Sequence, residues 1–399
     1  MSKKRKKWTK FRHKAITELA RLVLSPYIKW KYGVQVEPFR QQGNRPYLVL
    51  LNHQTAFDQF FVGMSFRGPV YYVATEDIFS LGWVSDLIRW AVAPIPIKKQ
   101  VTDAQAVKNC IRVAREGETI AIAPEGNRTY HGRTVSINPT IAGLAKKLKM
   151  PIALYRIEGG YGVQPRWSDG IRKGKMRAGV SQVIELQEYE KLTNDELLAR
   201  IREGLDVNEA VVNGVFHHKA LAQYLERVIY VCPDCGLSVF ESHGDLVQCK
   251  KCGKQVRYLL TRELEGVDRP FPFRFVADWY DYQCDYVNRL DIGAYRQTPI
   301  YQETARVFEV ILQRRKSELF SHACISLYGD RITIDERILP FEEIYAMAVL
   351  GRNKLNIYHN ERIYQLKGSP RFNALKYVNI YYHHKNTSRG EANGEFLGI

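Results

Sequence analysis

From residue 35 to residue 186, short apolar runs alternate with longer segments in which apolar residues recur at helical spacing. The apolar runs have the length of buried strands and cover residues 47–51, 70–74, 119–123 and 152–157. Between them, Ala, Val, Ile and Leu follow helical periodicity over residues 103–115 and 138–149. Alternation of this kind predicts an α/β domain in which helices flank a central sheet.

Beyond residue 186 the pattern changes to helices, then a cysteine-rich stretch, then a strand-rich end. Helical spacing covers residues 193–218, 275–290, 303–316 and 371–382, and short apolar runs with turn signals fill residues 325–366. The predicted parts are an N-terminal amphipathic helix (1–34), the α/β domain (35–218), a cysteine-rich ribbon (219–262), a helical linker (263–320), a small strand-rich α+β domain (321–385) and a disordered tail (386–399).

The composition adds a formal net charge of +17, with eight basic residues and no acid among the first fourteen positions. This surplus favours anionic partners such as nucleic acid, an acidic membrane surface, or phosphorylated and CoA-like substrates. Glu18, Arg21 and Lys29 interrupt the apolar run that follows, so no cleavable signal peptide is predicted. No later stretch reaches the roughly 18 uncharged apolar residues of a spanning helix. We therefore predict a cytoplasmic protein, peripheral on the cytoplasmic face of an anionic membrane.

The N-terminal helix itself has two interpretations. Apolar residues between positions 15 and 28 fall near helical spacing, with Arg21 and Lys29 elsewhere around the helix. The pattern fits an amphipathic helix that contacts a membrane, and it fits equally a helix packed on the domain behind a solvated basic tail.

The first candidate chemistry is the sequence NHQTAFD at residues 52–58, directly after the predicted strand 47–51. Neutral imidazole accepts a hydroxyl proton near neutral pH, and a carboxylate on the other ring nitrogen fixes its tautomer. His53 and Asp58 therefore form a candidate base and orienting carboxylate for a hydroxyl that belongs to the substrate. The alternative is structural, because Thr55 and Asp58 also have the spacing of a helix-capping box.

A second motif, APEGNRT at residues 123–129, follows the predicted strand 119–123. Gly126 permits a tight turn, and the planar guanidinium of Arg128 suits bidentate binding of phosphate. Upstream, IPIKK at residues 95–99 places Lys98 and Lys99 at another predicted strand end, where Lys99 fits a solvated loop.

Together these blocks resemble the glycerolipid acyltransferase family, whose best-known members acylate lysophosphatidate. Members typically carry NHxSxxD, an apolar block ending in Arg, FPEGTRS and VPIVPV, and here NHQTAFD, IPIKK, APEGNRT and MPIALY follow in that order within residues 46–157. His53, Asp58, Glu125, Gly126 and Arg128 match. The departures are Thr55 for Ser, Lys98 for Arg, Ala123 for Phe, Asn127 for Thr and Leu154 for the second Pro. They leave the identity of the acceptor open.

The resemblance implies the family fold, a central mixed sheet flanked by helices, and an O-acyltransferase of phospholipid synthesis. It implies that His53 is the general base that Asp58 orients, and that Arg128 and Lys98 hold the acceptor phosphate in a pocket shaped by Glu125 and Gly126. The donor would be acyl-CoA or acyl carrier protein and the acceptor lysophosphatidate or a related lipid. The acyl-chain length, the choice of acyl donor and the oligomeric state of the protein stay open.

Four of the seven cysteines form two CxxC pairs separated by thirteen residues, each pair followed by Gly. Cys232, Cys235, Cys249 and Cys252 have the composition of a zinc ribbon, a structural site with four cysteine ligands. Two disulfides or a redox pair are the alternatives, and a cytosolic setting disfavours the disulfides. The other three, Cys110, Cys284 and Cys324, lie in apolar contexts and are predicted core residues.

Two other functions compete with acyl transfer. The positive charge and the 12% aromatic content suit a basic zinc-ribbon protein that binds nucleic acid, although no nucleic-acid motif is present and the pattern of His53, Asp58 and Arg128 would then be unexplained. A catalytically inactive lipid-binding scaffold is the other. The strand-rich end with its terminal helix resembles a pleckstrin-homology-like domain by pattern alone.

Overall fold

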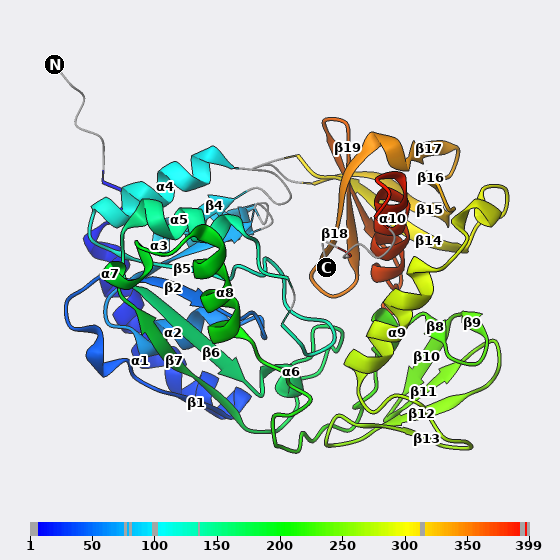
Figure 1. Cartoon of the computed structure of the whole chain (residues 1–399), viewed down its shortest axis with the longest axis horizontal. Coiled ribbons are helices and arrows are strands. Elements are labelled where there is room, and N and C mark those ends of the chain that lie inside the picture. Colours follow the sequence, from blue (N-terminus) through cyan, green and yellow to red (C-terminus); the bar gives the residue numbers. More distant parts are fainter. Residues whose placement is uncertain are drawn as a thin grey trace. The chain divides into compact units, whose positions relative to one another are not determined.

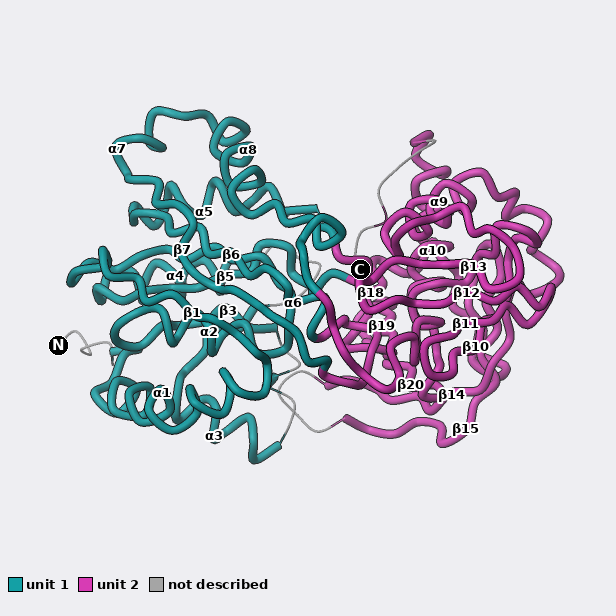
Figure 2. Tube along the Cα trace, turned by 90° about the horizontal axis from the view of Figure 1, so that it is seen from below, with its two compact units in different colours: residues 1–129, 133–163, 172–214 teal, residues 130–132, 164–171, 215–399 magenta. Residues whose placement is uncertain are grey.

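A computed structural model describes residues 7–75, 78–79, 82–97, 103–134, 136–311, 316–391 and 396. The chain divides into two compact units, coloured separately in Figure 2. Unit 1 comprises residues 1–129, 133–163 and 172–214, and unit 2 comprises residues 130–132, 164–171 and 215–399. Two short segments that the sequence placed inside the α/β domain therefore belong to the C-terminal unit.

Unit 1 is built on a seven-stranded sheet with the order β1-β7-β6-β2-β5-β3-β4 (Figure 1). Its strands are β1 Val34–Val36, β2 Leu48–Leu51, β3 Val70–Thr75, β4 Ile95–Ile97, β5 Thr119–Ile122, β6 Ile152–Glu158 and β7 Met176–Ile184. The pair β6–β7 is antiparallel and the other pairs are parallel. The predicted central mixed sheet is thus confirmed, and β2, β3, β5 and β6 coincide with the four predicted strands.

Helices cover both faces of this sheet. They are α1 Phe11–Tyr32, α2 Asp58–Ser65, α3 Trp83–Ala91, α4 Ala104–Arg115, α5 Thr140–Leu148, α6 Gly160–Val163, α7 Leu186–Tyr189 and α8 Asn194–Leu205. Helices α4, α5 and α8 pack together on one face, and α1 and α2 pack against each other and against β1, β3 and β7. None of the described helices combines the length and apolar character that a membrane-spanning segment needs.

The main core of unit 1 follows from the two-residue period of its strands. Leu48 and Leu50 on β2 point to the same side and join a buried cluster with residues of α4, α5 and α8. Val49 and Leu51 point to the other face, and they too are buried. Helix α4 starts where predicted because the Asp103 carboxylate accepts two backbone N–H groups of its first turn, each at 3.0 Å.

Unit 2 begins with a ribbon of short strands and continues into a larger sheet. The ribbon strands are β8 Val231–Cys232, β9 Gly236–Leu237, β10 Phe240–His243, β11 Leu246–Cys249, β12 Gln255–Tyr258 and β13 Leu264–Gly266. After helix α9 (Val276–Asn288), the second sheet contains β14 Tyr301–Glu309, β15 Ser317–Leu327, β16 Arg331–Ile334, β17 Arg337–Pro340, β18 Ile344–Leu350, β19 Lys354–His359 and β20 Arg362–Lys367, followed by helix α10 (Leu375–Ser388). All its pairings are antiparallel, in the order β17-β16-β15-β14-β20-β19-β18.

The structure corrects three predicted elements. The predicted helix 303–316 is wrong, because its first part is strand β14: Ala305 and Val307 point inward and are buried, while Arg306 between them is exposed. The strand-rich part therefore begins at Tyr301, inside the predicted helical linker. The helix predicted over residues 193–218 ends at Leu205, and the C-terminal helix continues into the predicted tail, to Ser388.

Candidate active site and candidate metal centre

The two sequence motifs follow neighbouring parallel strands of unit 1. Strands β2 and β5 pair in register, with Leu50 opposite Ile122. The motif NHQTAFD begins directly after β2 ends, and APEGNRT begins directly after β5 ends. Because the carboxyl ends of parallel strands meet at one edge of a sheet, the two loops are neighbours there, and this edge is where open α/β sheets place ligands.

His53 and Asp58 form a hydrogen-bonded pair. Nδ1 of His53 lies 2.8 Å from Oδ2 of Asp58. Because a carboxylate only accepts, in the neutral ring Nδ1 carries the proton and Nε2 presents its lone pair, which is the tautomer that a general base requires. The Asp58 side chain is 1% exposed and that of His53 is 28% exposed, so the His53 ring is accessible while its partner is not.

The Asp58 carboxylate accepts three further hydrogen bonds from its own loop. Oδ2 receives the Gln54 backbone N–H at 2.7 Å, and Oδ1 receives the Thr55 N–H at 2.9 Å and the Thr55 hydroxyl at 2.6 Å. A buried charge needs partners of this kind. The capping interpretation holds in part, because Asp58 accepts the Thr55 N–H as a capping carboxylate does, although α2 begins at Asp58 itself. The other carboxylate oxygen binds His53, and the catalytic role of the pair stays a prediction.

The second motif holds the backbone of His53 through hydrogen bonds. The Glu125 carboxylate accepts the backbone N–H of His53 at 2.7 Å, and Glu125 is 9% exposed. In return the Thr129 N–H donates to the His53 carbonyl at 3.3 Å. Gly126 turns the loop with a φ of +72°, a left-handed conformation that favours glycine, and its N–H bonds to the Ala123 carbonyl at 3.0 Å.

The structure says less about Arg128 and Lys98, the two predicted phosphate ligands. Arg128 lies in the same loop and is partly exposed. Lys98 lies outside the described residues, directly after β4. Their role as phosphate ligands stays a prediction.

Two residues of the first motif were not assigned roles from the sequence. Thr55 was treated as a stand-in for Ser, and its hydroxyl binds the Asp58 carboxylate. Asn52 bridges to β6, donating to the Ile157 carbonyl at 2.9 Å and accepting the Ile157 N–H at 2.8 Å. The capping-box spacing already paired Thr55 with Asp58, whereas motif spacing does not reveal the Asn52 contact, because it depends on which strand lies beside β2.

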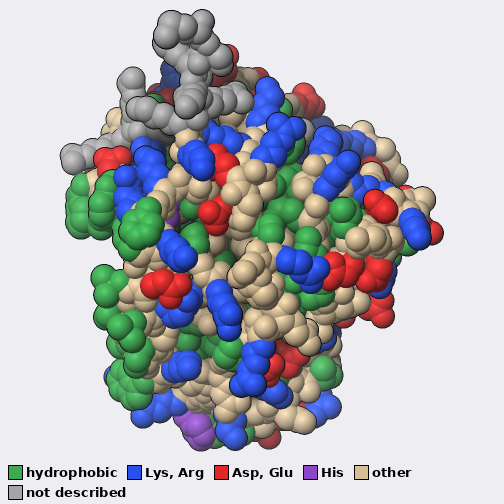
Figure 3. All heavy atoms as spheres, turned by 90° about the vertical axis from the view of Figure 1, so that its left-hand side faces the viewer, with side chains coloured by type: hydrophobic (Ala, Val, Ile, Leu, Met, Phe, Trp, Pro, Cys, Tyr) green, Lys and Arg blue, Asp and Glu red, His purple; other side chains and the backbone are tan. Residues whose placement is uncertain are grey.

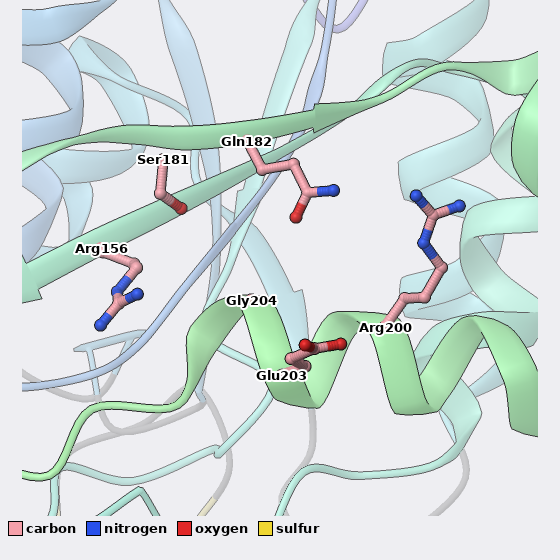
Figure 4. Close-up of a pocket in the computed structure, with 6 residues that line it drawn as sticks. All are labelled: Arg156, Ser181, Gln182, Arg200, Glu203 and Gly204. Atoms are coloured by element: carbon pink, nitrogen blue, oxygen red, sulfur yellow. The ribbon is translucent and has the colours of Figure 1, made fainter.

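A pocket of about 370 Å³ lies on β6, β7 and α8 (Figure 4). It is lined by Arg156, Ser181, Gln182, Arg200, Glu203 and Gly204. Its two arginines already pair with acids, Arg156 with Glu158 at 3.1 Å and Arg200 with Glu188 at 3.4 Å. We assign it no function.

The four predicted metal ligands come together in unit 2. The Sγ atoms of Cys232, Cys235, Cys249 and Cys252 all lie within 4.8 Å of one another. The Cys232–Cys252 and Cys235–Cys249 sulfur separations are 3.7 and 3.6 Å. A zinc–sulfur bond of about 2.3 Å places tetrahedral ligands about 3.8 Å apart, so the cluster fits Zn²⁺, whereas a disulfide needs about 2.05 Å.

The other cysteines are only partly as predicted. Cys110 is buried and Cys284 is half-buried, but Cys324 is exposed on β15, which corrects its assignment to the core.

Comparisons with known proteins find similarities in both units. Residues 33–157 match the family model described as Acyltransferase, and residues 225–259 match a zinc-ribbon model described as DNA directed RNA polymerase, 7 kDa subunit. The chain is 23% identical over 138 residues to 1-acyl-sn-glycerol-3-phosphate acyltransferase of Bacillus subtilis (strain 168), an alignment covering 34% of this chain and 65% of that protein. It is 24% identical over 209 residues to 1-acyl-sn-glycerol-3-phosphate acyltransferase LPAT1, chloroplastic, of Arabidopsis thaliana, covering 50% and 55%.

A solved structure also aligns, that of the 1-acyl-sn-glycerophosphate (LPA) acyltransferase PlsC from Thermotoga maritima. The identity is 20% and the TM-score 0.42, over 48% of this chain and 78% of that one. The chain spans less than two thirds of the length of the curated relatives it matches.

Residues 33–157, most of which lie in unit 1, are therefore similar to the Acyltransferase family, and the aligned curated relatives are 1-acyl-sn-glycerol-3-phosphate acyltransferases. Unit 2 contains a zinc ribbon with a complete set of four cysteine ligands.

Proposed function

We propose that the chain transfers a fatty-acyl group from acyl-CoA or acyl carrier protein to the hydroxyl of lysophosphatidate or a related glycerol-phosphate lipid, in phospholipid synthesis. The observation that carries this proposal is the His53–Asp58 pair, at 2.8 Å, held by the second family motif through Glu125 and Thr129. The names of the aligned relatives supply the substrate class.

The chemistry follows from the orientation of His53. Nε2 removes the proton from the acceptor hydroxyl as its oxygen attacks the thioester carbonyl carbon. The resulting tetrahedral intermediate expels the thiolate, which takes the proton back from Nε2, so that an ester forms and a free thiol leaves. Asp58 keeps the imidazole in the required tautomer and stabilises its charged form. Arg128, with Lys98, binds the acceptor phosphate, and Glu125 and Gly126 set the shape of that loop.

The test is release of free thiol from acyl-CoA and from acyl carrier protein, with lysophosphatidate or glycerol 3-phosphate as the acceptor. We expect release that depends on the acceptor, and mass spectrometry should show the acylated product. Absence of release with every donor and a wide acceptor panel would contradict the proposal. Lipid binding without turnover would then favour the scaffold, and salt-sensitive oligonucleotide binding would favour the nucleic-acid protein.

We further propose that unit 1 rests on a membrane through α1 and α3. Helix α1 buries His13, Ile28 and Tyr32 on one side. The exposed large apolar side chains of the two helices are Phe11, Leu19, Leu22, Val23, Tyr27 and Trp30 on α1 and Trp83, Leu87 and Trp90 on α3. Leu22, Trp30 and Trp83 are 77%, 80% and 73% exposed. Exposed apolar surface of this extent marks an interaction site, and tryptophan favours the membrane interface.

The two helices form one surface because they contact each other. Arg12 of α1 donates to the Trp90 carbonyl at 2.9 Å, and its guanidinium carbon lies 5.2 Å from the centre of the Trp90 ring. Figure 3 shows hydrophobic side chains gathered along one edge of the molecule with Lys and Arg beside them. This combination suits a surface of anionic lipid, which would bring the enzyme to a lipid acceptor. Peripheral association with the cytoplasmic membrane face is therefore part of the proposal.

Vesicle sedimentation tests this surface. The triple variant Leu22→Gln, Trp30→Gln, Leu87→Gln should bind anionic vesicles at least about tenfold more weakly, since each apolar side chain withdrawn from lipid loses on the order of 1.5 kcal/mol. The matched control is Val211→Gln, Val239→Gln, Ile338→Gln, which changes exposed apolar residues outside these helices. Equal binding by both triple variants would contradict the proposal.

For unit 2 we propose a structural zinc ion and a pleckstrin-homology-like module. The set of four cysteines has no open position for substrate, which is the arrangement of structural zinc sites. The module is supported by a seven-stranded antiparallel sheet whose first strand, β14, pairs with both its second, β15, and its last, β20, followed by helix α10.

A further inference from the structure

The chain directly after the second catalytic motif belongs to unit 2. Residues 130–132 cluster with that unit, although Thr129 belongs to unit 1, and residues 164–171 do the same. In the sequence these segments lie inside the acyltransferase domain, and the covalent chain joins them to unit 1 at both ends. The contacts within unit 2 show how firmly they are held.

Tyr130 and Arg166 bind one turn, residues 349–352, which joins β18 to β19. The hydroxyl of Tyr130, which is completely buried, donates to the Arg352 carbonyl at 2.8 Å. Nε of Arg166 donates to the Gly351 carbonyl and Nη2 to the Val349 carbonyl, each at 2.8 Å. The Arg166 guanidinium carbon lies 4.1 Å from the centre of the Tyr130 ring. We call Tyr130, Arg166 and this turn the Tyr130 clamp.

The Tyr130 clamp favours one geometry because the side chains that form it are buried and carry polar groups. Arg166 is 2% exposed, and a guanidinium at that depth is tolerated only with its donors paired. The turn offers the carbonyls of Val349, Gly351 and Arg352, and Gly351 adopts a φ of +63°, in the left-handed region that favours glycine. Removing one partner loses a buried hydrogen bond, so the clamp favours a single geometry over a sliding apolar contact.

A second set of contacts, which we call the second anchor, binds residues 164–171 to the same turn. The Asp169 carboxylate accepts from Arg227 at 2.7 Å and from Arg352 at 2.9 Å. Arg227 also donates to the Trp167 carbonyl at 2.7 Å, and the Trp167 ring packs edge-on against Tyr258 of the ribbon. Arg352 thus takes part in the Tyr130 clamp through its carbonyl and in the second anchor through its guanidinium.

The clamp restrains the catalytic motif through the covalent chain. Tyr130 follows Thr129, whose N–H bonds to the His53 carbonyl at 3.3 Å. Arg128 is two residues before Tyr130, so their Cα atoms lie within about 7 Å of each other whatever the loop conformation. Fixing Tyr130 therefore limits where Arg128 can place its guanidinium.

We propose that the turn 349–352, through Tyr130 and Arg166, positions the end of the APEGNRT loop, so that the C-terminal unit sets the affinity of the enzyme for its anionic acceptor. This rests on the proposed function for the role of Arg128. Tyr130 is a positioning residue: it acts through the loop and does not contact the substrate.

The variant Tyr130→Phe tests the clamp in the full chain, because it removes the hydroxyl and keeps the ring beneath Arg166. Its matched control is Tyr381→Phe, since Tyr381 is equally buried in unit 2 and its hydroxyl donates to the Ile344 carbonyl at 2.7 Å. We expect Tyr130→Phe to raise the KM for the lysophospholipid acceptor roughly fivefold, the equivalent of one net hydrogen bond. The KM for the acyl donor should not change, and Tyr381→Phe should alter neither. Equal effects of the two variants, or none from Tyr130→Phe, would overturn the proposal.

Hydrogen exchange provides a readout that needs no substrate. The backbone N–H groups of Thr129 and Gly126 are hydrogen-bonded, so both report on the order of the loop. Tyr130→Phe should make the Thr129 amide exchange several-fold faster, and Tyr381→Phe should leave it unchanged. If the wild-type chain transfers no acyl group, the proposed function fails, and this exchange difference still decides whether the clamp positions the loop. Identical exchange in both variants would exclude it.

Discussion

The His53→Ala variant is expected to transfer acyl groups about 10²- to 10⁴-fold more slowly than the wild-type chain, the usual contribution of a positioned general base. The side chain is 28% exposed and its backbone is held independently by Glu125 and Thr129. Removing the imidazole should therefore leave the fold intact. The measurement is kcat from acceptor-dependent thiol release, with the thermal midpoint of unfolding as a check on the fold.

The Asp58→Asn variant sharpens this prediction. An amide at this position can donate to Nδ1, which would move the ring proton to Nε2 and remove the lone pair that accepts the substrate proton. We expect a loss of kcat approaching that of His53→Ala. The control is His322→Ala, which removes an exposed histidine of β15 and should have no effect. Wild-type kcat in His53→Ala would exclude His53 as the base.

The sequence predicted the buried strands of unit 1, each of which is identified by a short run of apolar residues. Strands β2, β3, β5 and β6 are short apolar runs, and loop motifs mark the ends of β2 and β5. Strand β7 was not predicted because it is half exposed, and residues such as Arg177 and Ser181 interrupt its apolar pattern. Residues 303–309 were assigned to a helix because local spacing does not record partners, and β14 is defined by pairing with β15 and β20, the latter nearly sixty residues further on.

The contacts of the candidate site also fall into two groups: those within one loop, which the sequence indicated, and those between distant segments, which it did not. The His53–Asp58 pair lies within one loop, so the motif spacing indicated it, beside the capping-box alternative for Asp58. The bond from the His53 N–H to Glu125 depends on β2 and β5 being neighbours, and sequence spacing does not establish that. The Tyr130 clamp joins residues more than 180 positions apart and uses backbone carbonyls as acceptors, which leave no mark on residue type.

The zinc ribbon should be the part of the chain whose stability depends most on a single bound ion. Strands β8 and β9 have two residues each, and β10 and β11 have four, so the ribbon has a small apolar core. Below a certain size a core cannot stabilise a fold alone, and metal binding becomes folding free energy, about 10–16 kcal/mol for structural zinc in isolated fingers. We therefore expect one zinc per chain by atomic emission spectroscopy.

Replacing Cys249 with Ala should release this zinc and unfold the ribbon, because the buried thiolate is one of four ligands and three cannot close the tetrahedron. Hydrogen exchange over residues 231–258 should become fast, and the unfolding midpoint of the chain should fall by roughly ten degrees or more, since a loss of even several kcal/mol shifts a domain of this size that far. The matched control is Cys324→Ala, which removes an exposed thiol outside the cluster and should keep zinc and stability. Retention of zinc by Cys249→Ala would contradict the four-cysteine site. Loss of zinc without faster exchange would show that the ribbon folds without the ion.

Because Trp167 packs against Tyr258 of β12, unfolding of the ribbon should also weaken the second anchor, so Cys249→Ala is expected to raise the acceptor KM as Tyr130→Phe does.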